Sequence, residues 1–81
     1  MQSELNRLRW QCRRGLKELD AILCYYLDNN YVQAESVEQH LFLELLTLED
    51  DQLIAYFFSE TIPKNKGLAQ FVHKIRATFM D

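Results

Sequence analysis

The chain has 81 residues, of which 48% are hydrophobic and 26% charged, a composition typical of one folded domain and not of a disordered segment. A domain of this length buries only about 60–65% of the surface it exposes when unfolded, so it has room for a core but hardly for a deep pocket, which argues against a self-contained cofactor enzyme. With two glycines and one proline, it has too few turn formers for a β-sandwich or barrel. The net charge is only −3, yet the basic residues are confined to 7–17 and 64–76, and the segment from Asp20 to Pro63 contains acidic side chains but no lysine or arginine.

Five helices are predicted from hydrophobic periodicity and capping residues, and the first two fill the N-terminal part of the chain. We expect the first helix to begin at Ser3 as N-cap, with an apolar side formed by Leu5, Leu8 and Cys12. The second is expected to begin near Gly15 and to end at Asn29-Asn30. Its buried stripe is predicted to consist of Leu16, Leu19, Leu23, Tyr26 and Leu27.

The remaining three helices are predicted after Ser36. Ser36 followed by Gln39 has the spacing of a capping box, and the apolar positions of that helix are Val37, Leu41, Leu45 and Leu48. Thr47 and Asp50 both offer N-caps for the fourth helix, which ends before Pro63 and has its apolar side at Leu53, Ile54, Phe57 and Phe58. The fifth helix has the clearest stripe, made of Leu68, Phe71, Val72, Ile75 and Phe79. The short connections predict an all-α fold, a compact bundle that forms a single domain over residues 1–81.

The sequence also predicts the environment of the protein. No stretch approaches the roughly 18 apolar residues of a membrane span, and the first residues lack the apolar core of an export signal. We therefore expect a cytoplasmic protein that does not insert into membranes. Cys12 and Cys24 form neither a C-x-x-C motif nor a disulfide framework, so they are interpreted as free thiols in a reducing compartment.

Residues suited to catalysis or metal binding are scarce. The only histidines are His40 and His73, and neither lies in a recognisable catalytic constellation. His40 and Glu44, one turn apart, are two ligands without a third, so no metal site is predicted. The consecutive acids Glu49, Asp50 and Asp51 suit the positive end of a helix dipole better than catalysis. We expect no enzymatic activity.

The most informative segment runs from residue 10 to residue 20. Helical spacing places four residues on an outward stripe opposite the leucines: Arg14, Glu18, Ala21 and Tyr25. A purely structural interpretation is also possible, in which Gly15 permits a sharp entry between two helices, Glu18 caps the free backbone amides there and Arg14 pairs with Glu18. That ion pair has the weaker orientation and contributes only about 0.2–0.5 kcal/mol. A docking surface with Trp10 just upstream therefore has equal weight with the structural interpretation.

The run Arg14-Gly15-Leu16-Lys17-Glu18 resembles the R-G-x-x-E signature of the bacterial SdhE proteins, relatives of mitochondrial succinate dehydrogenase assembly factor 2. The similarity covers nearly the whole chain, and the residues that extend the motif are Trp10, Cys12, Arg13, Leu19 and Asp20. The acidic turn at 49–51 agrees with that family of small helical proteins. Gln52, in place of an acidic residue, and Tyr56, in place of a tryptophan, depart from it.

The resemblance implies a flavin-assembly factor that binds the flavoprotein subunit of succinate dehydrogenase and promotes covalent attachment of its FAD to a histidine of that subunit. Such a factor is not the catalyst and holds no FAD stably, and the flavoprotein of fumarate reductase is a second candidate partner. The resemblance places the contact with the partner at Arg14, Gly15 and Glu18. Further candidates are Arg9, Trp10, Asp20, Tyr25, Glu49, Asp50 and Asp51. We interpret Gly15 as a point of close approach, where Gly15→Arg blocks docking and leaves the bundle folded.

An alternative function is a small nucleic-acid-binding regulator. Its phosphate contacts would come from a basic patch made of Arg7, Arg9, Arg13, Arg14 and Lys17. The acidic middle of the chain counts against this function, so we expect no nucleic-acid partner. Nothing in the sequence demands more than a monomer.

Overall fold

Every regular element is helical in the computed structural model, which describes residues 2–80. The five predicted helices are present as α1 Gln2–Cys12, α2 Lys17–Tyr26, α3 Ser36–Leu46, α4 Asp50–Phe58 and α5 Lys66–Met80. The all-α prediction is confirmed for these residues, whereas Met1 and Asp81, included in the predicted domain, lie outside them. None of the helices within 2–80 is long and apolar enough to cross a membrane.

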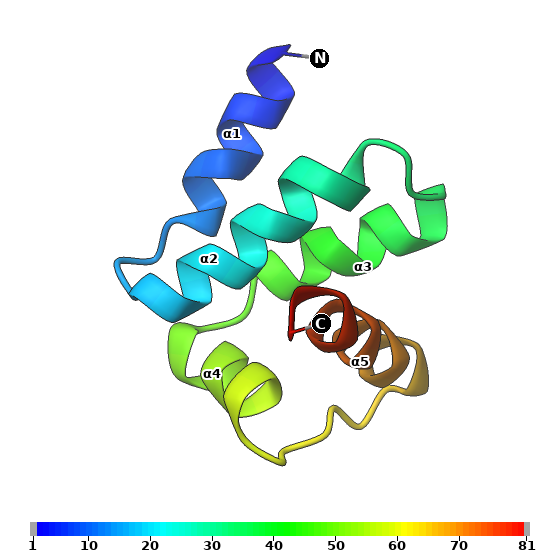
Figure 1. Cartoon of the computed structure of the whole chain (residues 1–81). Coiled ribbons are helices and arrows are strands. Elements are labelled where there is room, and N and C mark those ends of the chain that lie inside the picture. Colours follow the sequence, from blue (N-terminus) through cyan, green and yellow to red (C-terminus); the bar gives the residue numbers. More distant parts are fainter. Residues whose placement is uncertain (1, 81) are drawn as a thin grey trace.

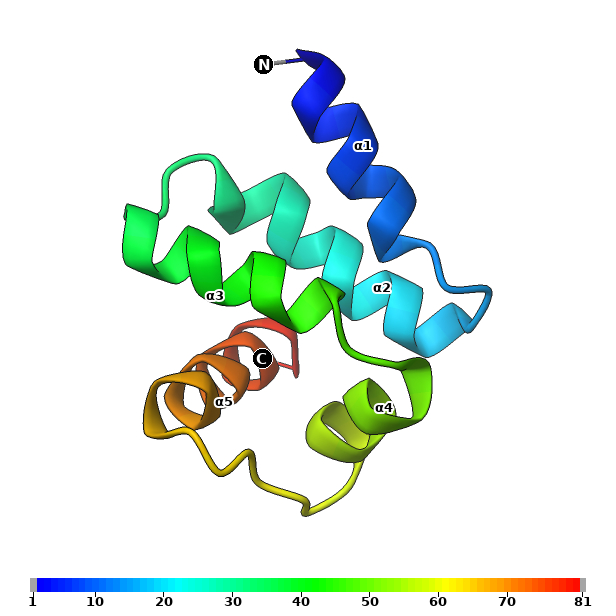
Figure 2. The ribbon, with the colours of Figure 1, turned by 180° about the vertical axis from the view of Figure 1, so that it is seen from behind.

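Helix α2 occupies the centre of the bundle and contacts α1, α4 and α5 (Figure 1). Helix α3 runs back alongside α2 in the opposite direction, α5 lies across the pair, and α4 packs near the start of α2. Figure 2 shows from behind that the N-terminal half of α1 stands away from the other helices. Because α2 and α3 run in opposite directions, the turn between α1 and α2 lies at the opposite end of the bundle from the start of α3.

Apolar side chains from all five helices meet in one core. Its centre is aromatic, because the ring of Tyr26 lies 4.7 Å from that of Phe42 and 5.2 Å from that of Phe71. The predicted stripes of α2 and α5 are largely confirmed. The buried residues that form this core are Leu8, Cys12, Leu19, Ile22, Leu23, Tyr26, Leu27, Tyr31, Phe42, Leu45, Leu46, Leu53, Phe57, Leu68, Phe71, Val72 and Ile75.

Three apolar residues predicted to face the core are exposed instead. Leu16 is 38% exposed because it precedes α2 in an extended conformation and so does not follow the helical spacing. Val37 is 71% exposed, since it lies five positions before the buried Phe42 and therefore about 140° around α3. Ile54 on α4 is 38% exposed, while Leu53 beside it is fully buried. Leu16 and Ile54 both lie near the turn between α1 and α2.

The predicted helix caps differ from the observed ones. Helix α1 already includes Ser3, and the N-caps of α3 and α4 are Glu35 and Glu49, neither of which makes a side-chain capping bond. The capping box expected from Gln39 is absent: its Nε2 donates to the backbone oxygen of Tyr31 at 2.7 Å. Gln39 thus joins α3 to the end of the preceding element and does not cap its own helix.

Helix α2 does not end at Asn29-Asn30 as predicted, but continues as a π-helical turn, η1, over Leu27–Tyr31. The wider turn carries Tyr31 back towards the face of Leu27, and both side chains are buried. Asn29 supports the end of α2, because its Nδ2 donates to the backbone oxygen of Tyr25 at 2.9 Å. The two asparagines therefore lie within the last turn and do not terminate the helix before it.

One carboxylate links three helices at the end of the bundle near the start of α3. Glu38 accepts hydrogen bonds from Tyr26 Oη at 2.5 Å and from Lys74 Nζ at 2.6 Å. Burial by itself would raise the pKa of Glu38, but these hydrogen bonds and the charge of Lys74 outweigh it and lower the pKa below its ordinary value. The charged form of Glu38 is therefore stabilised in the folded protein.

Glu38→Gln should lower the free energy of unfolding at pH 7 by about 1 kcal/mol. Because the folded-state pKa of Glu38 is lowered, its contribution is present above the unfolded-state pKa and is lost as the pH falls through the folded-state value. The difference between wild type and variant should therefore vanish in acid, as measured by urea unfolding from pH 7 down to pH 3. Glu44→Gln, at an exposed position of the same helix, is the matched control, and an equal effect from it would contradict the expectation.

Candidate functional site

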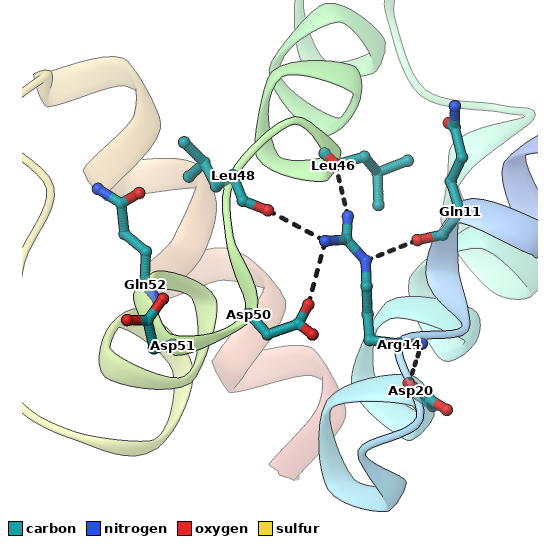
Figure 3. A network of polar contacts seen from close by, with 8 residues as sticks. All are labelled: Gln11, Arg14, Asp20, Leu46, Leu48, Asp50, Asp51 and Gln52. Atoms are coloured by element: carbon teal, nitrogen blue, oxygen red, sulfur yellow. Dashed lines mark hydrogen bonds and ion pairs between the residues drawn. The ribbon is translucent and has the colours of Figure 1, made fainter.

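The guanidinium of Arg14 joins two distant turns of the chain (Figure 3). Its Nη1 donates to the backbone oxygen of Leu48 at 3.0 Å and pairs with Asp50 Oδ1 at 3.2 Å, and its Nη2 donates to the backbone oxygen of Leu46 at 2.5 Å. Its Nε donates to the backbone oxygen of Gln11, at the end of α1, at 2.8 Å. Arg14 therefore fastens the turn between α1 and α2 to the turn between α3 and α4.

The prediction that Arg14 faces outward is wrong. Only 15% of its side chain is exposed, and its ion pair is with Asp50 and not with Glu18. Arg14 precedes the first residue of α2, so the helical spacing that placed it beside Glu18 does not apply to it. A direct contact between Arg14 and a partner stays a prediction, while its role inside the fold is clear.

Gly15 and Asp20 shape the same turn. Gly15 has a φ of +80°, a left-handed conformation that favours glycine, and no atom from outside residues 14–16 lies within 4 Å of the position where a Cβ would be. Asp20 Oδ1 accepts a hydrogen bond from the backbone N of Arg14 at 2.6 Å, so one of the free amides of this turn is capped by Asp20, whereas the side chain of Glu18 caps none. The backbone therefore gives a structural reason for Gly15, and the space beside it is open.

The rest of the outward stripe is confirmed. Glu18, Ala21 and Tyr25 are all exposed along α2. The side chain of Glu18 makes no hydrogen bond or ion pair with the rest of residues 2–80. Tyr25, 41% exposed, packs edge-on against Phe79 of α5 at 5.6 Å. This stripe carries a free carboxylate at one end and a half-exposed aromatic ring at the other.

Trp10 extends the exposed surface onto α1. It is 76% exposed, and it borders a shallow hollow that it shares with Asn6, Arg9 and Arg13. Arg9 pairs with Asp28 of η1 at 2.7 Å, which no sequence pattern had indicated. Because Arg9 and Arg14 both have intramolecular acidic partners, the basic patch required for binding nucleic acid is partly neutralised.

The acidic turn contains one side chain with an intramolecular ion pair, Asp50, and two without one, Glu49 and Asp51. Asp50 holds Arg14, whereas Glu49 and Asp51 are exposed. Gln52 and Tyr56, the two departures from the family pattern, lie one turn apart on α4, with Gln52 Nε2 donating to Tyr56 Oη at 3.4 Å. The structure thus brings the acidic turn against the segment around Gly15 through Arg14.

The described residues offer little else for chemistry. Among residues 2–80, no group of three histidine, cysteine or acidic side chains is arranged to hold a metal ion. Both cysteines are free, as predicted. Burial raises the pKa of the Cys12 thiol to about 12, with a further contribution from the adjacent Cys24, and burial also raises the pKa of Cys24. These thiols are therefore poor nucleophiles.

Comparisons with known proteins show the family of the chain. The family model Sdh5, described as flavinator of succinate dehydrogenase, matches residues 6–79. The FAD assembly factor SdhE of Xylella fastidiosa (strain 9a5c) is 37% identical over 75 residues, covering 93% of this chain and 77% of the relative. The FAD assembly factors SdhE of Psychrobacter arcticus and Methylococcus capsulatus are 39% and 37% identical, over 91% and 93% of this chain and 80% and 90% of theirs. The comparison with solved structures finds no match. The chain belongs to the SdhE family of FAD assembly factors.

Proposed function

We propose that this protein binds the flavoprotein subunit of succinate dehydrogenase and promotes the covalent attachment of FAD to it. Membership of the SdhE family is the observation that carries the proposal. The surface supports it, because Glu18 is charged, exposed and without an intramolecular partner, beside a turn held rigidly by Arg14. A rigid, pre-formed surface loses little conformational entropy when a partner docks on it.

The proposed mechanism uses binding energy and not catalytic groups. A domain of this size has no interior space for FAD, so the cofactor stays with the partner and the protein acts as a chaperone without enzymatic activity. If it binds more tightly to the flavoprotein conformation in which the flavin and the acceptor histidine meet, it increases the population of that conformation. Reactive groups held in that geometry then react faster without any contribution from the assembly factor to bond making.

Three further properties belong to the same proposal. The protein acts as a monomer and works in the cytoplasm. The flavoprotein of fumarate reductase is a second client, because it would present the same attachment chemistry. The R-G-x-x-E run supplies the contact through Gly15 and Glu18, with Trp10 and Tyr25 as neighbouring contacts.

Glu18→Ala should weaken capture of the cognate apo-flavoprotein by about five- to tenfold, because an ion pair with the partner is lost. The measurement is a pull-down followed by in-gel fluorescence of covalently bound flavin under ultraviolet light. Glu35→Ala, also exposed but at the other end of the bundle, is the matched control and should behave as wild type. If the wild-type protein neither captures the flavoprotein nor raises its flavin fluorescence, the proposed function is wrong.

A further inference from the structure

A hollow opens between the start of α2 and α4, next to Glu18. It has a volume of about 230 Å³ and is lined by Leu16, Lys17, Glu18, Leu19, Ile54 and Phe58. An apolar cavity of about 150 Å³ in another protein accommodates benzene, so this hollow has room for an aromatic or branched aliphatic side chain. None of the partner contacts expected from the sequence, apart from Glu18, lines it.

The floor of the hollow is apolar and exposed to solvent. Leu16 and Ile54 are each 38% exposed, and Phe58 is half-buried. They come from two elements that are far apart in the sequence, and Arg14 fastens the turn before α2 to the turn before α4. Burying such surface against a partner is favourable in proportion to the apolar area removed from water.

One acidic and one basic side chain, Glu18 and Lys17, line the hollow, and a second carboxylate lies close to it on α4. Glu18 has no intramolecular partner, and the exposed Asp51 lies one turn before Ile54 on the same face of α4. Lys17 is the one cationic side chain among the lining residues. A partner complementary to this surface therefore presents an apolar side chain with a lysine or arginine next to it.

We propose that this hollow receives an apolar side chain of the flavoprotein, whose neighbouring lysine or arginine pairs with Glu18. The inference rests on the proposed function, and it adds Leu16, Ile54 and Phe58 to the docking surface. Apolar anchors seated in pockets contribute most of the affinity of a typical interface, and charges at the rim mainly affect the association rate and its salt dependence.

Ile54→Glu tests the proposal, because it places a charge where the apolar side chain would sit. The dissociation constant of the Ile54→Glu variant for the apo-flavoprotein should be at least about tenfold higher than that of wild type, with a matching loss of covalent flavin. Val37→Glu is the matched control, since it makes the same type of change at a 71% exposed position at the opposite end of the bundle. It should bind within about twofold of wild type. Thermal unfolding of both variants shows whether either change acts through the fold.

A photo-crosslinking residue at position 54 gives a second readout that does not depend on lost affinity. Crosslinking to the flavoprotein is expected from position 54 and not from position 37. If wild type binds and Ile54→Glu binds equally well, or if position 37 crosslinks and position 54 does not, the hollow is not the docking site although the proposed function stands. If wild type forms a dimer that Ile54→Glu dissociates, a second copy covers the hollow and the inference is wrong. Failure of the wild-type protein to bind would instead contradict the proposed function.

Discussion

Arg14→Ala should lower the free energy of unfolding by about 2–4 kcal/mol. The substitution removes every hydrogen bond of the guanidinium, so that the backbone oxygens of Leu46 and Leu48 lose their charged donor in a partly buried place. It also separates the turn between α1 and α2 from Asp50. A domain of this size has a total stability of only about 5–10 kcal/mol. The midpoint of thermal unfolding should therefore fall by about 10–20 °C, as measured by circular dichroism.

Arg13→Ala is the matched control for this prediction. Arg13 is the preceding residue, carries the same charge and is exposed, and its removal should change the stability by no more than about 0.5 kcal/mol. Arg14→Lys should give an intermediate result, because a single ammonium keeps the charge but cannot span the separate acceptors that the guanidinium reaches. Equal melting of Arg14→Ala and Arg13→Ala would show that the network around Arg14 does not stabilise the fold.

The helices could be predicted because each is amphipathic over several turns. The stripe of Leu68, Phe71, Val72 and Ile75 specifies both the existence of α5 and its buried face, and the structure confirms both. Predictions that depended on a single residue at a helix end were less accurate. Ser36 and Gln39 have the spacing of a capping box, but Gln39 bonds to Tyr31, because a neighbouring backbone oxygen competes for its side chain.

The proposed docking surface was only partly predictable, because helical spacing describes contacts within one helix. It placed Glu18 and Tyr25 outward correctly, since both belong to α2. It failed for Arg14, which lies in a turn, because three of its four side-chain contacts are with residues 32 to 36 positions further along the chain. The hollow beside Glu18 was missed for the same reason: it exists only where α4 meets the start of α2, and nothing local indicates that meeting.

Variants of Gly15 should show whether this residue is needed for the backbone conformation of the turn or for contact with the partner. The φ of +80° at this position is strained for any residue with a Cβ, so Gly15→Ala and Gly15→Arg should each lower the free energy of unfolding by about 1–2 kcal/mol. Asparagine tolerates the left-handed conformation better than other residues, and Gly15→Asn should lower it by less than about 1 kcal/mol. A loss of this size still leaves the bundle folded, as the sequence predicts for Gly15→Arg, but because the turn is strained this variant cannot by itself identify a docking contact.

If the partner lies against the turn, the Gly15 variants should rank differently by flavoprotein capture than by stability. No atom of the protein occupies the space beyond Gly15, so a side chain there meets only the partner, and longer side chains interfere more. Gly15→Ala should then be less stable than Gly15→Asn yet capture more flavoprotein, and Gly15→Arg should capture none. Gly67→Ala, at a glycine of α5 without a positive φ, controls for the loss of a glycine elsewhere and should capture normally. If capture instead follows the melting temperature across the series, Gly15 serves the turn alone, and the partner is oriented by Glu18 and the surface that Arg14 holds in place.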